Sequence, residues 1–250
     1  MEQPPRVVIG IAGPMGAGKS YAADLLAEKY RSMGRTAEVI PFARPLKAIA
    51  GHLACLAGFD PHSDEAKNAV IETVPYRYSW IPPCVETLTG AAYDPNRLDP
   101  VFGMEQRYMY ARMVEAFDRI FVRRDGCWRF RENEAGVTFG RLLQLLGTEG
   151  MRGSFGEDVF VKAARAALER ATADVLIFPD VRFENEAAFV REAGKLIHIQ
   201  PAFAIELGDG RKETHASEAG VGSAVGDITV WNHGDEWFAA AIFAAAKVEK

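Results

Sequence analysis

Cysteine is scarce in this chain: Cys55, Cys84 and Cys127 are the only three in 250 residues. They lie far apart and form no Cys-x-x-Cys pair, so the sequence predicts neither a zinc site nor a disulfide framework, and a reducing cytoplasmic setting is expected. An excess of positive charge is also absent, because the net charge is −5. This argues against nonspecific binding to nucleic acid. Apolar runs are too short for a signal peptide near the N-terminus or for a membrane span at 238–246, so no membrane partner is expected.

The stretch from Gly13 to Ser20 matches the phosphate-binding loop pattern G-x-x-x-x-G-K-[ST]. An apolar run at 7–12 precedes it and an amphipathic segment follows it, which is the strand–loop–helix context that the pattern requires. Glycines let successive N–H groups point at phosphate oxygens, and the helix N-terminus adds partial positive charge. Lys19 can reach the β- and γ-phosphates of a nucleoside triphosphate, and the Ser20 hydroxyl suits Mg²⁺. The expected nucleotide-binding residues are Gly13, Met15, Gly16, Ala17, Gly18, Lys19, Ser20 and Tyr21.

The order of predicted elements indicates an α/β fold with a parallel sheet between helices. A helix is expected over 21–33, a strand over 37–42 and a second helix from Pro45 to Gly58. Further strands are expected at 175–178, 196–199 and 228–230. The remaining helices are expected at 104–122, at 138–147 with a glycine turn at its end, at 158–171, around Glu186 with a stop at Gly194, and from about Asp235.

Residues 60–100 differ from the rest of the chain, because they contain six of the 13 prolines and show no clear periodicity of hydrophobic residues. We therefore expect one domain over residues 1–250, built around the phosphate loop, with an inserted, irregular and helical subdomain at about 59–135. A polar loop flanked by glycines, at about 201–222, is predicted to be a lid that carries a cation over the transferring phosphate.

Polar side chains stand where predicted strands end. Asp180 and Arg182 follow the strand at 175–178, and Glu186 lies about one turn into the next helix. In open parallel sheets ligands collect at the carboxyl ends of strands, so a functional role is favoured over a helix cap with its counter-ion. At the end of the strand at 37–42, Phe42, Arg44 and Lys47 can face the substrate, and an ordinary solvated helix start is an equally good interpretation for each.

A second polar pair lies on the predicted helix at 138–147. Arg141 and Gln144 are three residues apart, so their side chains share one face and can reach the same ligand.

Taken together, these motifs resemble those of bacteriophage-type deoxynucleoside monophosphate kinases, a branch of the P-loop nucleoside monophosphate kinases. The resemblance spans nearly the whole chain, and its narrowest blocks are Gly-Thr-Glu and Asp-x-Arg-Phe-x-Asn-Glu. The shared pattern starts with the phosphate loop and with the separate stretch Phe42-Ala43-x-Pro45-Leu46-Lys47. It continues with Arg141 and Gln144, which lead to Gly147-Thr148-Glu149 and Arg152, and with Asp180-x-Arg182-Phe183-x-Asn185-Glu186. It ends with His215-x-Ser217-Glu218 and a last strand that ends at Asn232.

The resemblance implies transfer of the γ-phosphoryl group of ATP, with Mg²⁺, to a deoxynucleoside 5′-monophosphate. It also implies a single P-loop kinase domain whose insertion at about 59–135 binds that acceptor. It implies that Lys19, Asp180, Arg182 and Arg141 are catalytic and that Ser20 and Asp180 serve the metal. Asp180 would order Mg²⁺-bound water or take a proton from the acceptor, and Glu186 would orient an arginine or contact the sugar. The protein would act in the host cytoplasm if a phage encodes it, and a homodimer is compatible with the chain. The expected substrate-binding residues are Phe42, Lys47, Arg141, Gln144, Gly147, Thr148, Arg152, Asp180, Arg182 and Glu186.

Where the family often has an acidic residue before the proline, this chain has Arg44, which leaves the role of 42–47 open. Two rival functions share some of these features. A kinase for another small acceptor, such as dephospho-coenzyme A, would share the loop, the arginines and the closing strand. A nucleotide switch or motor would share the loop alone, but the chain has no N-K-x-D guanine-reading motif and no acidic residue directly after Asp180.

Overall fold

The computed structural model describes residues 6–58, 69–75, 79, 81–89, 100–202 and 220–247. The chain divides into two compact units, which we call the sheet unit (residues 1–43, 160–207 and 213–250) and the helical unit (residues 44–159 and 208–212). The predicted insertion at about 59–135 falls within the helical unit, and its role in acceptor binding stays a prediction. Of the predicted lid, residues 203–219, which include His215, Ser217 and Glu218, lie outside the described part of the chain.

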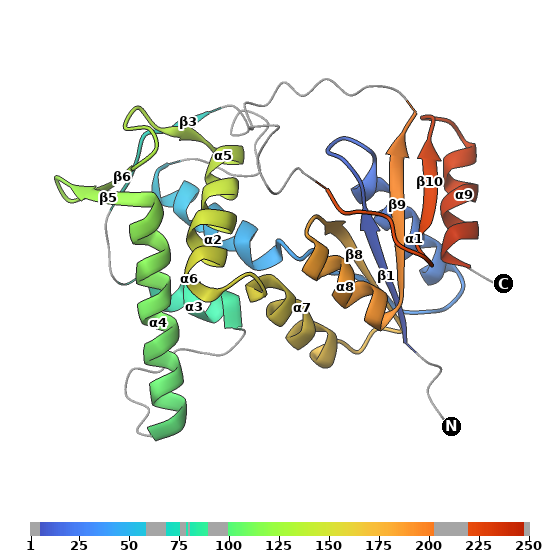
Figure 1. The fold of residues 1–250 in the computed structure, drawn as a ribbon, viewed down its shortest axis with the longest axis horizontal. Coiled ribbons are helices and arrows are strands. Elements are labelled where there is room, and N and C mark those ends of the chain that lie inside the picture. The colour runs from blue at the N-terminus through green and yellow to red at the C-terminus, as the bar shows by residue number, and fades with distance from the viewer. Residues whose placement is uncertain are drawn as a thin grey trace. The chain divides into compact units, whose positions relative to one another are not determined.

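Five parallel strands form the central sheet of the sheet unit, in the order β10-β9-β1-β8-β2 (Figure 1). Three of them are nearly continuous apolar runs, as expected for strands that are covered on both faces. The α/β fold with a parallel sheet between helices, predicted from the sequence, is confirmed. The strands are β1 (Val7–Ala12), β2 (Ala37–Val39), β8 (Val175–Val181), β9 (Lys195–Pro201) and β10 (Ile228–Asn232).

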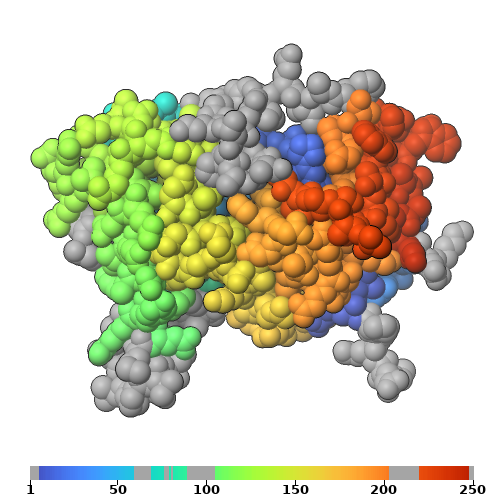
Figure 2. All heavy atoms as spheres, in the orientation of Figure 1, coloured from blue at the N-terminus to red at the C-terminus, as the bar shows by residue number. Residues whose placement is uncertain are grey.

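Two helices cover each face of this sheet, because successive strand residues point to opposite faces. Ile9 and Ile177 pack with α1 (Lys19–Ser32) and α9 (Trp237–Ala246) in one core cluster. Val8 and Leu176, their neighbours in sequence, pack with α7 (Val159–Arg170) and α8 (Glu184–Ala193) in the other. In Figure 2 the gold and orange side chains of α7 and α8 cover the face that is turned to the viewer.

Strand β8 continues three residues beyond its predicted end at Phe178, through Pro179 to Val181. A proline in a central strand normally removes a ladder hydrogen bond. Here β2 pairs with β8 only as far as Ile177, and the register toward β1 is irregular between Gly10 and Ala12. Pro179 therefore occupies a place where its missing N–H costs little.

The helical unit combines helices with two small antiparallel sheets. The strand pair β3-β7 forms one sheet and β4-β6-β5 the other. Phe117, Phe121, Trp128 and Phe130 form an aromatic cluster in its core, with ring centroids 4.9–6.3 Å apart. The elements are α2 (Arg44–Leu56), β3 (Val70–Ile71), β4 (Thr73–Pro75), α3 (Ile81–Thr89), α4 (Pro100–Ile120), β5 (Phe121–Arg124), β6 (Cys127–Phe130), β7 (Val137–Thr138), α5 (Phe139–Gln144), a π-helix (Leu145–Arg152) and α6 (Gly153–Phe155).

The hairpin β5-β6 was not predicted. The helix expected over 104–122 ends at Ile120, and the arginine pair Arg123-Arg124 that follows lies in β5 instead of at a helix end. Asp125 and Gly126 form the turn, with φ angles of 52° and 77°. Two residues with positive φ give the turn twist that matches a tight hairpin, so the Asp-Gly pair was the available signal. Among the described residues, no helix combines the length and apolar character needed to cross a membrane.

A buried ion-pair network fixes the segment before β10 to α8 and β9. The Asp227 carboxylate accepts hydrogen bonds from Arg191 (3.1 and 2.8 Å), from His198 Nε2 (2.9 Å) and from the Ala224 N–H (2.9 Å). Its side chain is only 2% exposed. Burial alone raises the pKa of Asp227, but the bonds from Arg191, Ala224 and His198 outweigh burial and hold the pKa well below its ordinary value.

Replacing Asp227 with asparagine is expected to lower the free energy of unfolding at pH 7 by about 2 kcal/mol, because the half-buried Arg191 would lose its bidentate partner and keep only Glu184 as a counter-charge. The carboxylate has a lower pKa in the folded than in the unfolded chain. The contribution of the ionised Asp227 to the free energy of unfolding is therefore complete above the ordinary pKa of about 3.9, and it is lost as the pH falls below that value. Urea unfolding should show a constant difference between wild type and Asp227→Asn from neutral pH to about pH 5, shrinking below pH 4. The exposed control Glu169→Gln should show no such difference, and equal pH profiles for wild type and Asp227→Asn would contradict the assignment.

Candidate active site

The phosphate-loop sequence forms the connection between β1 and α1. Gly13, Gly16 and Gly18 all have positive φ, at 144°, 77° and 92°. Gly18 is the N-cap of α1, and neither a side-chain cap nor an acidic residue occupies the first turn. Uncapped N–H groups at a helix N-terminus, next to a glycine-rich turn, form a ready site for phosphate oxygens. The loop therefore fits a nucleotide phosphate by its backbone geometry as well as by its sequence.

Two of these glycines are also required by close packing. A Cβ atom on Gly13 would lie 2.3 Å from the Ile199 carbonyl oxygen on β9. On Gly18 it would lie 2.6 Å from Nδ2 of Asn232, at the end of β10. Both distances are far below van der Waals contact, so another residue at position 13 would push the loop away from β9, and one at position 18 would displace the Asn232 side chain.

Asn232 holds the loop from the neighbouring part of the sheet edge. Its Nδ2 donates a hydrogen bond to the Ala17 carbonyl (3.0 Å), and its Oδ1 accepts one from the Gly234 N–H (2.9 Å). From the sequence, Asn232 was expected only as the end of a strand, and this contact was not predicted. The available signal was a polar amide directly after an apolar strand that ends at the same sheet edge as β1.

Lys19 lies against its own loop, where Nζ donates to the carbonyl oxygens of Gly13 (2.7 Å) and Pro14 (2.6 Å). Ser20, next along α1, is exposed, and Tyr21 is 60% exposed and stacks on Phe238 with ring centroids 6.3 Å apart. No cluster of three His, Cys, Asp or Glu side chains that could hold a metal exists in the described part of the chain. Mg²⁺ often binds with few protein ligands and several waters, so one serine hydroxyl beside bound phosphates fits it.

Asp180, near the end of β8, binds the backbone that leads from β2 into α2. Its Oδ1 accepts the Phe42 N–H (2.7 Å) and its Oδ2 accepts the Ala43 N–H (3.1 Å). The predicted strand over 37–42 is shorter than expected for this reason: β2 ends at Val39, and the N–H groups of Phe42 and Ala43 turn to the carboxylate. Asp180 thus fixes the backbone at the carboxyl edge of the sheet.

The expectation that Phe42 faces the substrate is not met in this structure. Its ring is 3% exposed and packs against Phe178 and Phe189, with centroids 5.0 and 5.9 Å away. An aromatic side chain directly after a buried strand contributes more free energy in the core than at an open edge. Lys47, by contrast, is exposed on α2.

Glu186 holds the backbone at Arg182. Its Oε2 accepts the N–H groups of Arg182 (2.9 Å) and Phe183 (3.2 Å), and the residue is 3% exposed. This is the reach-back bond of a glutamate at the third position of a helix, which satisfies N–H groups that α8 cannot bond itself. Glu186 therefore caps the start of α8 and fixes the backbone at Arg182. Its predicted role toward an arginine side chain or the sugar stays a prediction.

In the helical unit, Arg141 is buried at 7% exposure among polar partners. Its Nε donates to Glu132 Oε1 (2.9 Å), its Nη2 donates to Glu132 Oε2, and Glu149 Oε1 lies 3.7 Å from Nη2. Its Nη1 donates to Gln144 Oε1 (3.1 Å), so the predicted pair does share one face. The bonds to Glu132 raise the pKa of Arg141. The sequence did not predict Glu132 as the partner of Arg141, since Glu132 lies nine residues away in a loop and belongs to no recognisable motif.

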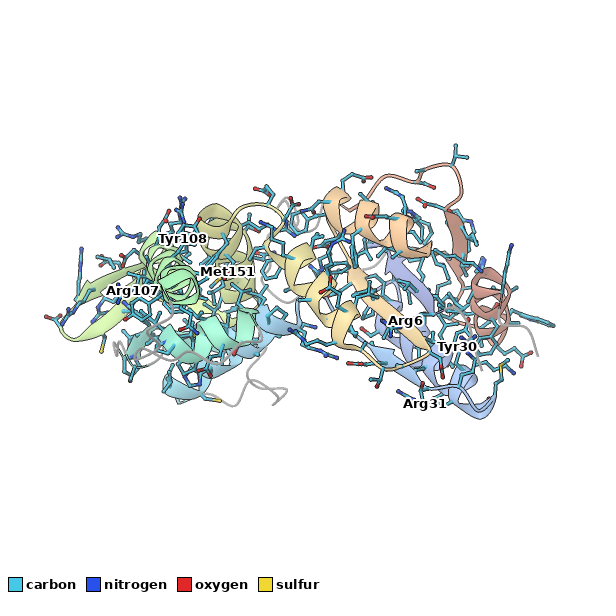
Figure 3. The ribbon with its side chains drawn as sticks, turned by 90° about the horizontal axis from the view of Figure 1, so that it is seen from below. Arg6, Tyr30, Arg31, Arg107, Tyr108 and Met151 are labelled. Atoms are coloured by element: carbon cyan, nitrogen blue, oxygen red, sulfur yellow. The ribbon has the colours of Figure 1, made fainter. Side chains whose placement is uncertain are left out.

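The glycine turn predicted after Gln144 is wrong. Residues Leu145–Arg152 form a π-helix that continues α5, and Met151 on it, labelled in Figure 3, is fully buried. A Cβ on Gly147 would meet Leu46 Cδ2 of α2 at 3.0 Å, so this glycine allows close helix packing rather than a turn. Thr148, between them, is half-buried. π-helices are rare and often occur at functional sites.

Arg152, at the end of this π-helix, is 3% exposed, and its Nη1 donates to the Glu157 carbonyl oxygen. The Glu157 carboxylate lies 3.7 Å from the same nitrogen. These contacts hold the guanidinium against the chain just beyond α6.

A second group of cations lies at the amino edge of the sheet, where a cavity of about 380 Å³ is lined by Arg6, Tyr30, Arg35 and Lys195, among others (Figure 3). Arg6 donates to the carbonyl oxygens of Leu168 and Ala171, and Lys195 Nζ donates to that of Ala246. These carbonyls belong to the C-terminal ends of α7 and α9, where positive charge is favourable. This cluster is accounted for by helix capping.

Predicted site residues thus gather in two places. In the sheet unit the phosphate loop, Asp180 and Arg182 follow the adjacent strands β1 and β8, where Ala12 pairs with Val181, and Asn232 joins them from β10. In the helical unit Arg141, Gln144 and Glu149 come together.

Comparison with known proteins bears on both groups. A model of the deoxynucleotide monophosphate kinase family matches residues 105–236, which is more than half of the 250-residue chain. The match includes Arg141, Gln144, Asp180 and Arg182, and the phosphate loop precedes it. A search of curated proteins found no match. The extent of the family match shows that this chain belongs to the deoxynucleotide monophosphate kinase family.

Proposed function

We propose that the protein transfers the γ-phosphoryl group of ATP to a deoxynucleoside 5′-monophosphate. The family match carries the acceptor class, and the uncapped, glycine-rich start of α1 beside Lys19 supports a triphosphate donor. A phosphate oxygen of the acceptor attacks the γ-phosphorus, and the bond to the β–γ bridging oxygen breaks. The products are a deoxynucleoside diphosphate and ADP.

Such a reaction requires mainly in-line positioning and neutralisation of charge. The loop N–H groups hold the donor phosphates, and Lys19 moves from the carbonyls of Gly13 and Pro14 to the β- and γ-phosphates. Mg²⁺, when bound at Ser20, supplies charge neutralisation for the donor oxygens. Each oxygen of the Asp180 carboxylate accepts one backbone N–H, from Phe42 or Ala43. Its remaining lone pairs can accept hydrogen bonds from metal-bound water.

Among the predicted arginines, we propose Arg182 as the ligand of the acceptor phosphate, because Glu186 fixes its backbone at the carboxyl edge of the sheet. A guanidinium offers two parallel donors to a phosphate. Arg141 and Arg152 are buried and bonded to Glu132 and Glu157. Their charges are already balanced, so we propose positioning roles for them in place of the predicted contact with the substrate.

The expected result of a direct test is that ATP with Mg²⁺ converts at least one of dAMP, dCMP, dGMP and dTMP to its diphosphate. Products are separated and quantified for each acceptor, for dephospho-coenzyme A and for a reaction without acceptor. Transfer to a monophosphate should exceed hydrolysis of ATP by orders of magnitude. Conversion of dephospho-coenzyme A alone would favour the rival kinase, and hydrolysis alone would favour a motor.

A further inference from the structure

We propose that Asn232 is a positioning residue for the donor nucleotide, which fixes the peptide between Ala17 and Gly18 so that the Gly18 N–H faces the donor phosphates. The inference rests on the proposed function and deepens it, because it assigns a part in ATP binding to a residue far from the phosphate-loop motif in the sequence. It starts from the two hydrogen bonds of the Asn232 amide.

The neighbours of the Asn232 side chain leave its amide only one orientation. The Ala17 carbonyl oxygen can only accept a hydrogen bond, so the amide atom that faces it at 3.0 Å must be the donor Nδ2. The Gly234 N–H can only donate, so the amide atom 2.9 Å from it must be the acceptor Oδ1. A flip of the amide would break both bonds at once. Asn232 is therefore held by the turn between β10 and α9, and it presents a donor to the loop.

The bond to Ala17 also determines where the next N–H of the loop points. In a trans peptide the C=O of one residue and the N–H of the next point in opposite directions, and this part of the chain has no cis peptide. With the Ala17 oxygen turned to Asn232, the Gly18 N–H points away from Asn232. The side of Gly18 that faces Asn232 is filled, since a Cβ atom there would lie 2.6 Å from Nδ2. A phosphate oxygen can therefore approach the Gly18 N–H from the opposite side.

This peptide needs a support because glycine allows it to turn over. Gly18 has a φ of 92°, and glycine adopts positive and negative φ about equally readily. A peptide that turned over would change the sign of that φ and would present the Ala17 oxygen where the Gly18 N–H had been. A carbonyl oxygen repels phosphate, whereas an N–H at the start of a helix binds it. Asn232 thus stabilises the orientation that binds the donor.

The experiment measures the affinities for ATP and for inorganic tripolyphosphate, each with Mg²⁺, by calorimetry with wild type, Asn232→Asp and Asn232→Leu. Asn232→Asp keeps an acceptor for the Gly234 N–H but sets an oxygen against the Ala17 oxygen. Asn232→Leu removes both bonds without adding charge. Both variants should bind ATP about 10- to 100-fold more weakly, which corresponds to the loss of one hydrogen bond to a charged group. Tripolyphosphate has neither base nor sugar and should lose affinity by the same factor.

Steady-state kinetics should show the same division between the two substrates. The KM for ATP is expected to rise by the factor found in the binding measurement, and the KM for the monophosphate should stay unchanged. The matched control is Asn133→Asp in the helical unit. Asn133 Oδ1 accepts the N–H of Ala135, two residues further on, at 3.1 Å, which is the same kind of turn that Asn232 forms with Gly234. This control adds the same charge to the chain and should leave the affinity for ATP unchanged.

A role of Asn232 in folding alone would lower the melting temperature and leave the affinity of the folded protein for tripolyphosphate unchanged, and that result would overturn the inference. So would a loss seen only in Asn232→Asp that disappears at high salt, because repulsion by an added charge is screened there. If thermal unfolding shows that one variant does not fold, the other decides. If wild type binds ATP and phosphorylates monophosphates but the folded variants match it, the inference alone fails. If wild type binds no ATP, the proposed function and the inference fail together.

Discussion

Replacing Lys19 with alanine is expected to lower the rate of phosphoryl transfer by at least about 10³-fold, the loss typical for removing a charge that stabilises a transferring phosphoryl group. Lys19 is the lysine of the phosphate loop, and Nζ lies at hydrogen-bond distance from two carbonyls of that loop. The ammonium is therefore already within the loop that receives the phosphates. Purified enzyme at saturating ATP and monophosphate gives kcat directly.

Loss of the two carbonyl contacts could also disturb the loop, so binding and folding need their own measurements. The melting temperature of Lys19→Ala should stay close to that of wild type, because the side chain has little part in the core. Lys162→Ala, which removes an exposed lysine of α7, is the matched control and should retain full activity. Near-normal turnover by folded Lys19→Ala protein would remove Lys19 from the mechanism.

Replacing Arg182 with lysine is expected to lower kcat/KM for the monophosphate by about 10- to 100-fold, because lysine keeps the charge and loses the two parallel donors. The affinity for ATP should change little, since the loop amides and Lys19 hold that substrate. Steady-state kinetics with each substrate varied, together with direct ATP binding, separates the two effects.

If Arg182 were only a surface counter-ion, its replacement by lysine would leave the kinetics unchanged. Exposed ion pairs contribute at most about 1 kcal/mol to the free energy of unfolding. The matched control is Arg170→Lys, at an exposed position on α7. Because the backbone N–H of Arg182 bonds to Glu186, the lysine variant retains this local backbone support. Unchanged acceptor kinetics in Arg182→Lys would exclude Arg182 from the acceptor site.

Local sequence predicted the features that depend on local chemistry. The phosphate loop needs only glycines, a lysine and a following helix, all of which are neighbours along the chain. The strands β1 and β8 are long apolar runs because helices cover both faces of the sheet, and their pattern is readable for the same reason. Asp180 and Arg182 were expected at the carboxyl edge because a parallel sheet places the ends of its strands there.

Features set by distant residues were not predictable in the same way. Asp180 and Phe42 are 138 residues apart, so the sequence showed a carboxylate but not the N–H group that it bonds. Gly147 was predicted as a turn residue, because the neighbouring sequence does not show that Leu46 of another helix packs against this position. The ion pair of Arg141 with Glu132 likewise depends on how the loop before β7 folds back.

The hydrogen bond from Asn232 to Ala17 also bears on the order in which the protein matures during synthesis. Asn232 leaves the ribosome 215 residues after Ala17. The two strands that flank β1, which are β8 and β9, also come from the last third of the chain. A nascent chain that already contains the complete phosphate-loop motif therefore has no sheet to hold that motif in shape. A chain that stops before Asn232 therefore has the motif without the contact that holds it in shape.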